Sequence, residues 1–214
     1  MMKKLEGIYG ILPADLDLDA LLQRAEAALR GGVRVLQLRD KKTGYRRRLE
    51  RARALRALTS SHDARLIIND SLQLAIEAGA DGVHLGRGDL DKSLAQLRME
   101  EGARQLIIGI TCRADAAFAR HVLNEGADYV SFGAIWASGT KPDVPPIGLA
   151  RLHKARQLFP EATICAIGGI TRERLPQVRR AGADLAAVVS SLFESSDIEA
   201  TARDMVACWT GMTS

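Results

Sequence analysis

The chain has 214 residues, of which 47% are hydrophobic and only 4% aromatic, and its formal net charge is +4. These values fit one soluble domain over 1–214, with a core of aliphatic side chains. They exclude a protein that spans a membrane, because no apolar run approaches the length of a bilayer-crossing helix.

The positive charge is concentrated at 46–56, where arginines alternate with leucine and alanine at helical spacing. No aromatic side chains interleave with these arginines to stack on bases, so we interpret the run as the solvated face of an amphipathic helix rather than a nucleic-acid site. The three cysteines, Cys112, Cys165 and Cys208, are far apart and odd in number. They argue against a disulfide framework and for a cytoplasmic location.

Short apolar runs alternate with amphipathic stretches along the whole chain. Strands are expected at 7–13, 33–39, 65–69, 82–86, 106–111, 129–135, 163–168 and 185–190. Helices are expected at 17–30, 44–60, 71–78, 90–99, 114–125, 148–158, 172–181 and 198–209. Glycine-containing segments separate helix from strand, and Gly-Ala-Asp recurs at 79–81, 126–128 and 182–184.

Eight strand–helix pairs in strict alternation predict parallel strands with right-handed crossovers. We expect the α/β class and a closed (β/α)8 TIM barrel. An open, doubly wound sheet is the alternative, and for nucleotide binding it would need a Gly-x-Gly-x-x-Gly turn after the first strand. Residues 11–15 are Ile-Leu-Pro-Ala-Asp, so that turn is absent.

Polar residues follow the second strand, and in a TIM barrel function lies at the carboxyl ends of the strands. Alternation places Gln37, Arg39 and Lys41 on one side of the strand and Leu38 on the other. Polar and cationic groups that converge in this way suit a polyanion. The alternative is an ion pair within the barrel together with a loop lysine.

Two carboxylates follow the third and fourth strands, Asp70 and Asp89. These strands are neighbours in a barrel, so the two side chains could face one ion, and Mg²⁺ commonly takes one or two carboxylates with phosphate oxygens and waters. Asp70 could instead be the N-cap of the next helix. His84, on the fourth strand, either points inward or packs, and we expect packing.

Hydroxyl groups follow the fifth and sixth strands. Thr111 either binds a substrate or caps the next helix, and the sequence leaves both open. The run Ser138-Gly139-Thr140-Lys141 combines hydroxyls, a glycine and a cation, which is typical of oxyanion binding.

Paired small residues follow the last two strands, Gly168-Gly169 and Ser190-Ser191. The loops at these positions form the recurrent phosphate site of TIM barrels. The polar groups after strands two, three, four and six form one expected anion site, and the loops after strands seven and eight form a second. Two anion sites in one mouth indicate two phosphorylated reactants or one bisphosphate. No nucleophile–base pair is evident, which suits a reaction driven by loss of a good leaving group such as a Mg²⁺-bound diphosphate.

Taken together, these motifs resemble the thiamine phosphate synthase family, from Tyr9 to about Leu192. The residues that carry the resemblance are 37–41, 68–70, 82–86 with Asp89, 138–141, 166–170 and 189–190. The family joins a hydroxymethylpyrimidine diphosphate to a thiazole phosphate, giving thiamine phosphate and pyrophosphate. The resemblance implies a dissociative mechanism, in which pyrophosphate leaves, a pyrimidine methylene cation forms, and the thiazole nitrogen captures it.

The resemblance also implies roles for individual residues. Asp70 and Asp89 would bind Mg²⁺, and catalytic roles would belong to Arg39, Lys41, Thr111 and Lys141. The pyrimidine diphosphate would be held by Gln37, Arg39, Lys41, Asn69 and Lys141. The thiazole phosphate would be held by Ser138, Thr140, Gly169, Val189 and Ser190. Substrate contacts are further expected from Leu38, Asp40, Thr111 and Gly139. The expected partners are these small molecules, in a monomer or small homo-oligomer.

The chain departs from the family at three positions. Thr111 stands where serine is usual, Arg87 where glutamine is common, and Ser138 where threonine is usual. Two alternatives remain. A thiazole tautomerase would share the barrel and the thiazole site, and a non-catalytic thiamine-precursor sensor would bind ligand only. Neither needs the paired carboxylates, which argue against both.

Overall fold

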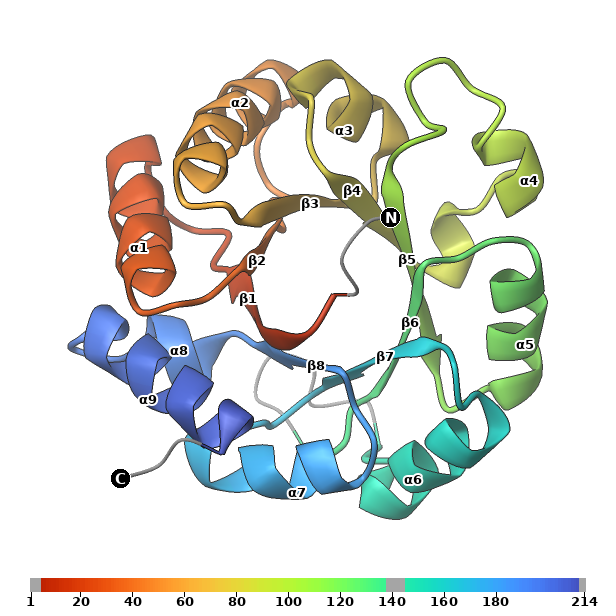
Figure 1. The fold of residues 1–214 in the computed structure, drawn as a ribbon. Coiled ribbons are helices and arrows are strands. Elements are labelled where there is room, and N and C mark those ends of the chain that lie inside the picture. The colour runs from red at the N-terminus through yellow and green to blue at the C-terminus, as the bar shows by residue number, and fades with distance from the viewer. Residues whose placement is uncertain (1–4, 138–144, 212–214) are drawn as a thin grey trace.

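The computed structural model describes residues 5–137 and 145–211, and its strands close into a barrel in the order β1 to β8 (Figure 1). The strands are β1 Gly7–Leu12, β2 Val35–Leu38, β3 Arg65–Asn69, β4 Gly82–Leu85, β5 Ile107–Arg113, β6 Tyr129–Gly133, β7 Thr163–Ile167 and β8 Leu185–Val188. All neighbours are parallel, and β1 pairs with β8 to complete the closure. The predicted (β/α)8 TIM barrel is confirmed.

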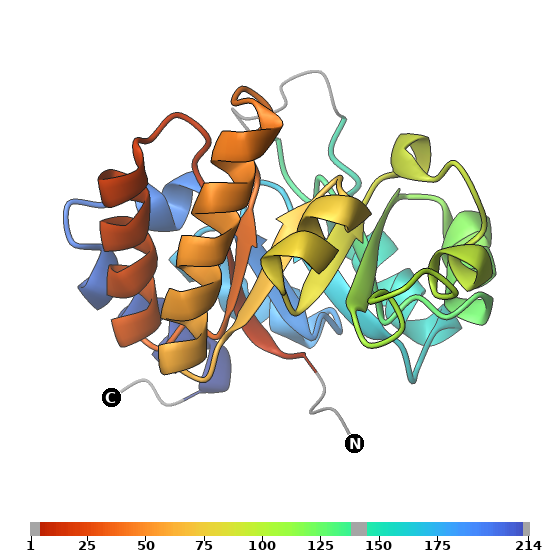
Figure 2. The ribbon, with the colours of Figure 1, turned by 90° about the horizontal axis from the view of Figure 1, so that it is seen from above.

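Helices ring the strands (Figures 1 and 2). The helices are α1 Leu18–Arg30, α2 Tyr45–Ser61, α3 Leu72–Ala78, α4 Leu94–Leu97, α5 Ala116–Asn124, α6 Gly148–Leu158, α7 Leu175–Arg180, α8 Ser190–Phe193 and α9 Ile198–Thr210. Two short 3₁₀ turns are η1 Arg87–Asp89 and η2 Arg172–Arg174. Among residues 5–137 and 145–211, no helix combines the length and apolarity needed to cross a bilayer.

The core has two layers because successive strand residues face opposite sides. The outer layer packs the strands against the helices, with Leu36, Leu66 and Val83 fully buried. The inner layer fills the barrel, and its buried members are Tyr9, Ile11, Val35, Ile67, Ile107, Tyr129, Cys165, Leu185 and Ala187. Each buried aliphatic side chain contributes about 2 kcal/mol by leaving water.

Several predicted boundaries are wrong. The expected helix at 90–99 is only Leu94–Leu97, because Leu94 and Leu97 alone are buried there and the chain turns at Gly102, with φ of 83°. The strand expected at 129–135 ends at Gly133, and the one expected at 185–190 ends at Val188. The sequence analysis did not predict helix α8, which begins directly after Val189.

The amino ends of the strands, the floor of the barrel, explain the recurring Gly-Ala-Asp. Asp81, Asp128 and Asp184 each begin the turn into an even-numbered strand and accept a backbone N–H from the preceding odd-numbered strand, from Leu66, Ile108 and Ile164 at 2.7–2.9 Å. Each also pairs with arginine: Arg65 and Arg56 on Asp81, Arg98 on Asp128, and Arg156 on Asp184. We call these three contacts the floor clasps.

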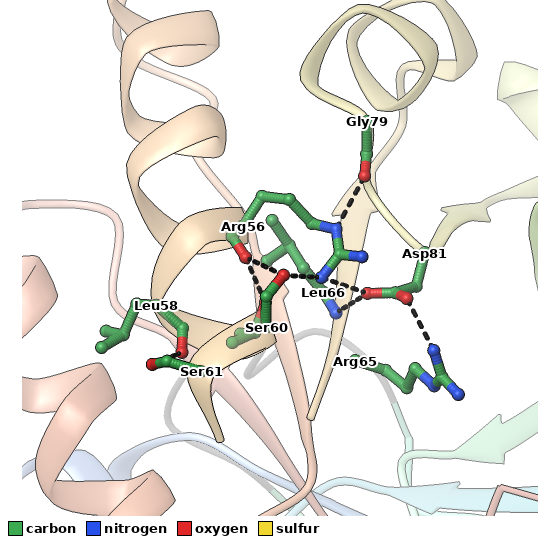
Figure 3. Close-up of polar contacts among 9 residues, drawn as sticks. Arg56, Leu58, Ser60, Ser61, Arg65, Leu66, Gly79 and Asp81 are labelled. Carbon is green, nitrogen blue, oxygen red and sulfur yellow. Dashed lines mark hydrogen bonds and ion pairs between the residues drawn. The ribbon is translucent and has the colours of Figure 1, made fainter. Parts of the chain in front are cut away.

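Figure 3 shows the clasp at Asp81, whose carboxylate joins Arg56 of α2, Arg65 and the backbone of Leu66. Arg56 also donates to the carbonyl oxygen of Gly79 at 2.8 Å. One carboxylate thus ties two strands and a helix together. Residues at this end of a TIM barrel serve stability, which frees the opposite end for chemistry.

Candidate active site

The β2 and β3 loops meet at the mouth through an ion pair. Lys41 Nζ lies 2.6 Å from Asp70 Oδ2, and the lysine side chain is 55% exposed. Asp70 has φ of 63°, which is uncommon for a residue other than glycine, and its N–H donates to the carbonyl oxygen of His84 at 2.9 Å. This backbone contact fixes the Asp70 carboxylate at the rim of the mouth.

The alternative role of Asp70 as a helix cap is wrong. Ser71 is the N-cap of α3, and its side chain accepts from the N–H of Leu74. The Asp70 carboxylate is therefore available to the mouth, where Lys41 holds it.

Arg39 and Asn69 end the same two strands and are half-buried. Within residues 5–137 and 145–211, neither side chain has a hydrogen bond or ion pair. An arginine that is partly desolvated without a counter-charge is costly, and an anionic ligand relieves that cost.

Asp40 lies in the β2 loop but is buried, with 6% exposure. Its carboxylate accepts from the N–H groups of Lys42 and Thr43, from the Thr43 hydroxyl at 2.6 Å, and from Arg51 at 2.7 Å. Burial alone would raise the pKa of Asp40, but the hydrogen bonds from Thr43 and Lys42 and the charge of Arg51 outweigh it and hold that pKa below its usual value. Asp40 shapes the loop that carries Lys41.

Asp89 is exposed at the end of η1, and its Oδ2 accepts the N–H of Gly86 at 2.7 Å. Arg87, on the same turn, pairs with Asp115 at 2.5 Å and lies 4.0 Å from the ring centroid of Phe118. This departure from the family pattern therefore has a structural role: Arg87 fastens the turn that carries Asp89 to the start of α5.

His84 faces the interior of the barrel, which is the inward orientation and not the one that we favoured, and its ring also stacks on Tyr129. Its Nε2 lies 2.8 Å from the Thr111 hydroxyl, and its Nδ1 lies 2.8 Å from the hydroxyl of Tyr129. Thr111 lies within β5 and does not cap α5, whose N-cap is Asp115. The register of β5 against β6 shifts between Thr111 and Arg113, a type of irregularity that re-aims side chains near active sites.

The predicted alternation in β2 is confirmed for Gln37 and Leu38. Gln37 is buried in the barrel and donates to the hydroxyl of Tyr9 at 2.7 Å, while Leu38 packs in the outer layer. Sequence reasoning missed Tyr9 and Tyr129, because both lie inside strands and the search for functional groups was confined to the strand ends. Strand alternation was the available signal, since it turns both tyrosines inward with the other inner-layer residues.

Glycines bring the β7 loop against the β6 loop. Gly168 and Gly169 have φ of 103° and 61°, and added Cβ atoms would lie 2.5 Å from the Cβ of Ala134 and 2.8 Å from that of Trp136. Both positions therefore need glycine for packing as well as for any close approach of phosphate.

Side chains donate hydrogen bonds to carbonyl groups of the β7 loop. Arg174 donates to the carbonyl oxygen of Gly169 at 2.5 Å and lies over the Trp136 ring at 4.7 Å. Ser191 donates to the carbonyl oxygen of Ile170 at 2.8 Å. Val189 is half-buried and Ser190 exposed where β8 passes into α8. The expected oxyanion run, Ser138, Gly139, Thr140 and Lys141, lies outside the described residues.

The buried thiols do not supply a nucleophile. Burial raises the pKa of Cys112 to about 12, and burial also raises that of Cys165. A thiol so far from ionisation is inert at neutral pH. His62, His121 and His153 belong to the outer helices or their ends. Within the described residues, the interior offers the hydrogen-bonding side chains of Gln37, His84 and Thr111.

A closed barrel whose carboxyl-end mouth gathers cations, carboxylates and glycine loops is typical of TIM-barrel enzymes that act on anionic small molecules. The thiamine monophosphate synthase family model matches residues 8–192. The chain is 45% identical over 206 residues to thiamine-phosphate synthase of Thioalkalivibrio sulfidiphilus, covering 96% of each protein. It is 44% identical over 208 residues to that of Bordetella bronchiseptica, covering 95% of this chain and 94% of the relative.

A solved structure agrees with these sequences. Thiamine phosphate pyrophosphorylase from Pyrococcus furiosus superposes with a TM-score of 0.82 at 27% identity, covering 97% of both chains. The chain belongs to the thiamine monophosphate synthase family. It is a transferase of thiamine biosynthesis.

Proposed function

We propose that this transferase joins 4-amino-2-methyl-5-hydroxymethylpyrimidine diphosphate to 4-methyl-5-(2-phosphoethyl)thiazole, with Mg²⁺, to give thiamine phosphate and pyrophosphate. The observation that carries the proposal is the Lys41–Asp70 pair at the rim, with half-buried Arg39 in the same loop. A cation beside a carboxylate suits a diphosphate that arrives with a divalent ion.

Asp70 and Asp89 fit a Mg²⁺ ion that is completed by substrate. Within the described ranges, no three His, Cys, Asp or Glu side chains form a group that could hold a metal alone. Mg²⁺ commonly uses one or two carboxylates and fills its octahedron with phosphate oxygens and waters. When bound, the ion would neutralise charge on the diphosphate and so improve it as a leaving group.

The protein groups act by electrostatics and position. Arg39 and Lys41, with Lys141 from outside the described residues, would stabilise the diphosphate as negative charge grows on it. Gln37, Asn69 and Thr111 would orient the pyrimidine, while Ser138, Thr140, Gly169, Val189 and Ser190 would hold the thiazole phosphate. Substrate contacts from Leu38, Asp40 and Gly139 remain predictions. The described interior holds no nucleophilic thiol, in keeping with dissociative loss of pyrophosphate before the thiazole nitrogen bonds to the pyrimidine methylene carbon.

A cytoplasmic location is part of this proposal. Its support is that Cys112, Cys165 and Cys208 are all free thiols. We expect the protein to be a monomer or a small homo-oligomer.

The test is a coupled assay of pyrophosphate release with Mg²⁺ and both precursors, with thiamine phosphate measured in the same samples. We expect both products in equal amounts, and no release when Mg²⁺ is chelated or the thiazole phosphate is omitted. Isomerisation of a thiazole precursor without pyrophosphate release would overturn the proposal in favour of a tautomerase. Binding of precursors without any turnover would indicate a sensor.

A further inference from the structure

A continuous chain of hydrogen bonds crosses the barrel interior below the mouth. Its members come from five strands: Gln37 of β2, Tyr9 of β1, Tyr129 of β6, His84 of β4 and Thr111 of β5. The successive distances are 2.7 Å, 3.1 Å, 2.8 Å and 2.8 Å. Only the last member, Thr111, has been given a catalytic role.

Gly109 makes this chain possible. It lies in register between His84 and Tyr129 on the neighbouring strands. A Cβ on Gly109 would lie 1.9 Å from the phenol ring of Tyr129. The missing side chain lets that ring stack on His84, with centroids 5.5 Å apart and planes at 26°. The interior is thus built to bring a phenol hydroxyl to the histidine.

Each phenol supplies one proton. Tyr9 and Tyr129 are completely buried, and burial raises the pKa of both well above that of a free phenol, so both stay protonated. A buried hydroxyl proton that finds no acceptor is costly, so a phenol that accepts from one neighbour is expected to donate its own proton to the other.

The Gln37 end sets the direction of these hydrogen bonds. Its amide N–H donates to Tyr9 at 2.7 Å, and within the described residues the other hydrogen-bond partner of the Tyr9 hydroxyl is Tyr129. We therefore assign the Tyr9 proton to Tyr129, and the Tyr129 proton to its remaining partner, Nδ1 of His84. A neutral imidazole that accepts at Nδ1 carries its proton on Nε2. Nε2–H then donates to Thr111, and the hydroxyl proton of Thr111 is left for a ligand.

We propose that His84 is a positioning residue, neutral with its proton on Nε2, that makes the Thr111 hydroxyl a hydrogen-bond donor to a ring nitrogen of the pyrimidine substrate. The pyrimidine part rests on the proposed function. An aminopyrimidine offers acceptor nitrogens in its ring and a donor in its amino group. If every hydrogen bond in the chain were reversed, Thr111 would accept from the amino group of the substrate. The direction of the hydrogen bonds therefore selects which edge of the pyrimidine ring Thr111 contacts.

The first test reads the tautomer directly and needs no substrate. Protein labelled with ¹⁵N-histidine is examined by long-range ¹H–¹⁵N NMR at neutral pH, and His84→Asn assigns the His84 signals among the four histidines. We expect a neutral ring with the proton on Nε2. A proton on Nδ1, or a doubly protonated ring, overturns the proposal whatever the enzyme turns over.

The second test removes one hydroxyl away from the mouth. Tyr129→Phe keeps the buried ring but leaves Nδ1 of His84 without its donor, so the fixed tautomer should be lost in the same NMR experiment. The KM for the pyrimidine diphosphate should rise about fivefold, the order expected for one weakened hydrogen bond, while the KM for the thiazole phosphate stays unchanged. An unchanged tautomer and pyrimidine KM in Tyr129→Phe would contradict the proposal.

Two conservative substitutions of Thr111 distinguish hydrogen-bond donation by its hydroxyl from packing of its side chain. Thr111→Ser keeps the hydroxyl, whereas Thr111→Val keeps the shape, so the pyrimidine KM of Thr111→Val should exceed that of Thr111→Ser about tenfold. Equal behaviour of the two variants would exclude a hydrogen bond from Thr111 to the substrate. Absence of pyrophosphate release by the wild-type protein would refute the proposed function and leave the tautomer measurement standing.

Discussion

Aspartates paired with basic side chains lie at both the floor and the mouth of this barrel, but their surroundings differ. At the floor, Asp81, Asp128 and Asp184 each hold an arginine and a strand N–H, so these carboxylates are satisfied within the protein. At the mouth, the carboxylates of Asp70 and Asp89 have contacts to Lys41 and to the Gly86 N–H, both through Oδ2. We therefore expect the strand end at which an aspartate lies, more than its residue type, to decide whether it stabilises the fold or binds ligand.

The largest expected effect comes from the mouth. Asp70→Asn tolerates the positive φ of this position but removes a charge from the predicted metal site. We expect kcat/KM with Mg²⁺ to fall by about 100-fold or more, while the thermal midpoint stays close to that of the wild type. Steady-state pyrophosphate release and calorimetry on one preparation measure both quantities. Wild-type turnover by this variant would remove Asp70 from the metal site.

The matched change at the floor should do the reverse. Asp184→Asn weakens the clasp to Arg156 and the backbone of Ile164. We expect the free energy of unfolding to fall by about 2 kcal/mol, with kcat of the folded protein unchanged. Urea titration and an assay well below the melting temperature test this. A loss of kcat without a loss of stability would break the distinction between the two ends.

Substitution of Arg87 should have a smaller effect on activity than the changes at Asp70 and Asp184 have on activity and stability. Arg87 touches Asp115 and Phe118 on the outside of the barrel, so Arg87→Gln loosens the turn before Asp89 without altering any carboxylate. We expect the apparent Mg²⁺ requirement to rise by no more than about fivefold, because an exposed ion pair contributes little. A Mg²⁺ titration of activity measures it, and a loss as large as that of Asp70→Asn would show that Arg87 contacts the ligand.

Asp40 should show the smallest effect, and acid should abolish it. Its pKa in the folded protein is lowered from 3.8, so its ionised form stabilises the fold above that pH, and this contribution is lost as the pH falls from 3.8 through the folded pKa. The stability gap between wild type and Asp40→Asn should therefore shrink below pH 3.8 in urea titrations. A gap that does not vary with pH would assign the effect to packing. An increase in substrate KM would support the predicted substrate contact of Asp40.

The fold could be predicted from the sequence because alternation between strand and helix is a long-range regularity. The short elements could not: α4 and α8 have four residues each, too few for a periodic pattern. The strand ends located Arg39, Lys41 and Asp70, whereas the roles of Tyr129 and Gly109 depend on a contact between neighbouring strands that no local pattern shows. His84 was misplaced for the same reason.

The most direct test is calorimetric titration of pyrophosphate, with and without Mg²⁺, into wild type, Asp70→Asn and Asp184→Asn. If the mouth binds a metal-assisted diphosphate and the floor only holds the barrel together, wild type and Asp184→Asn will bind pyrophosphate with Mg²⁺, and Asp70→Asn will not. Equal binding by all three proteins, or binding that is unaffected by removing Mg²⁺, would contradict this account.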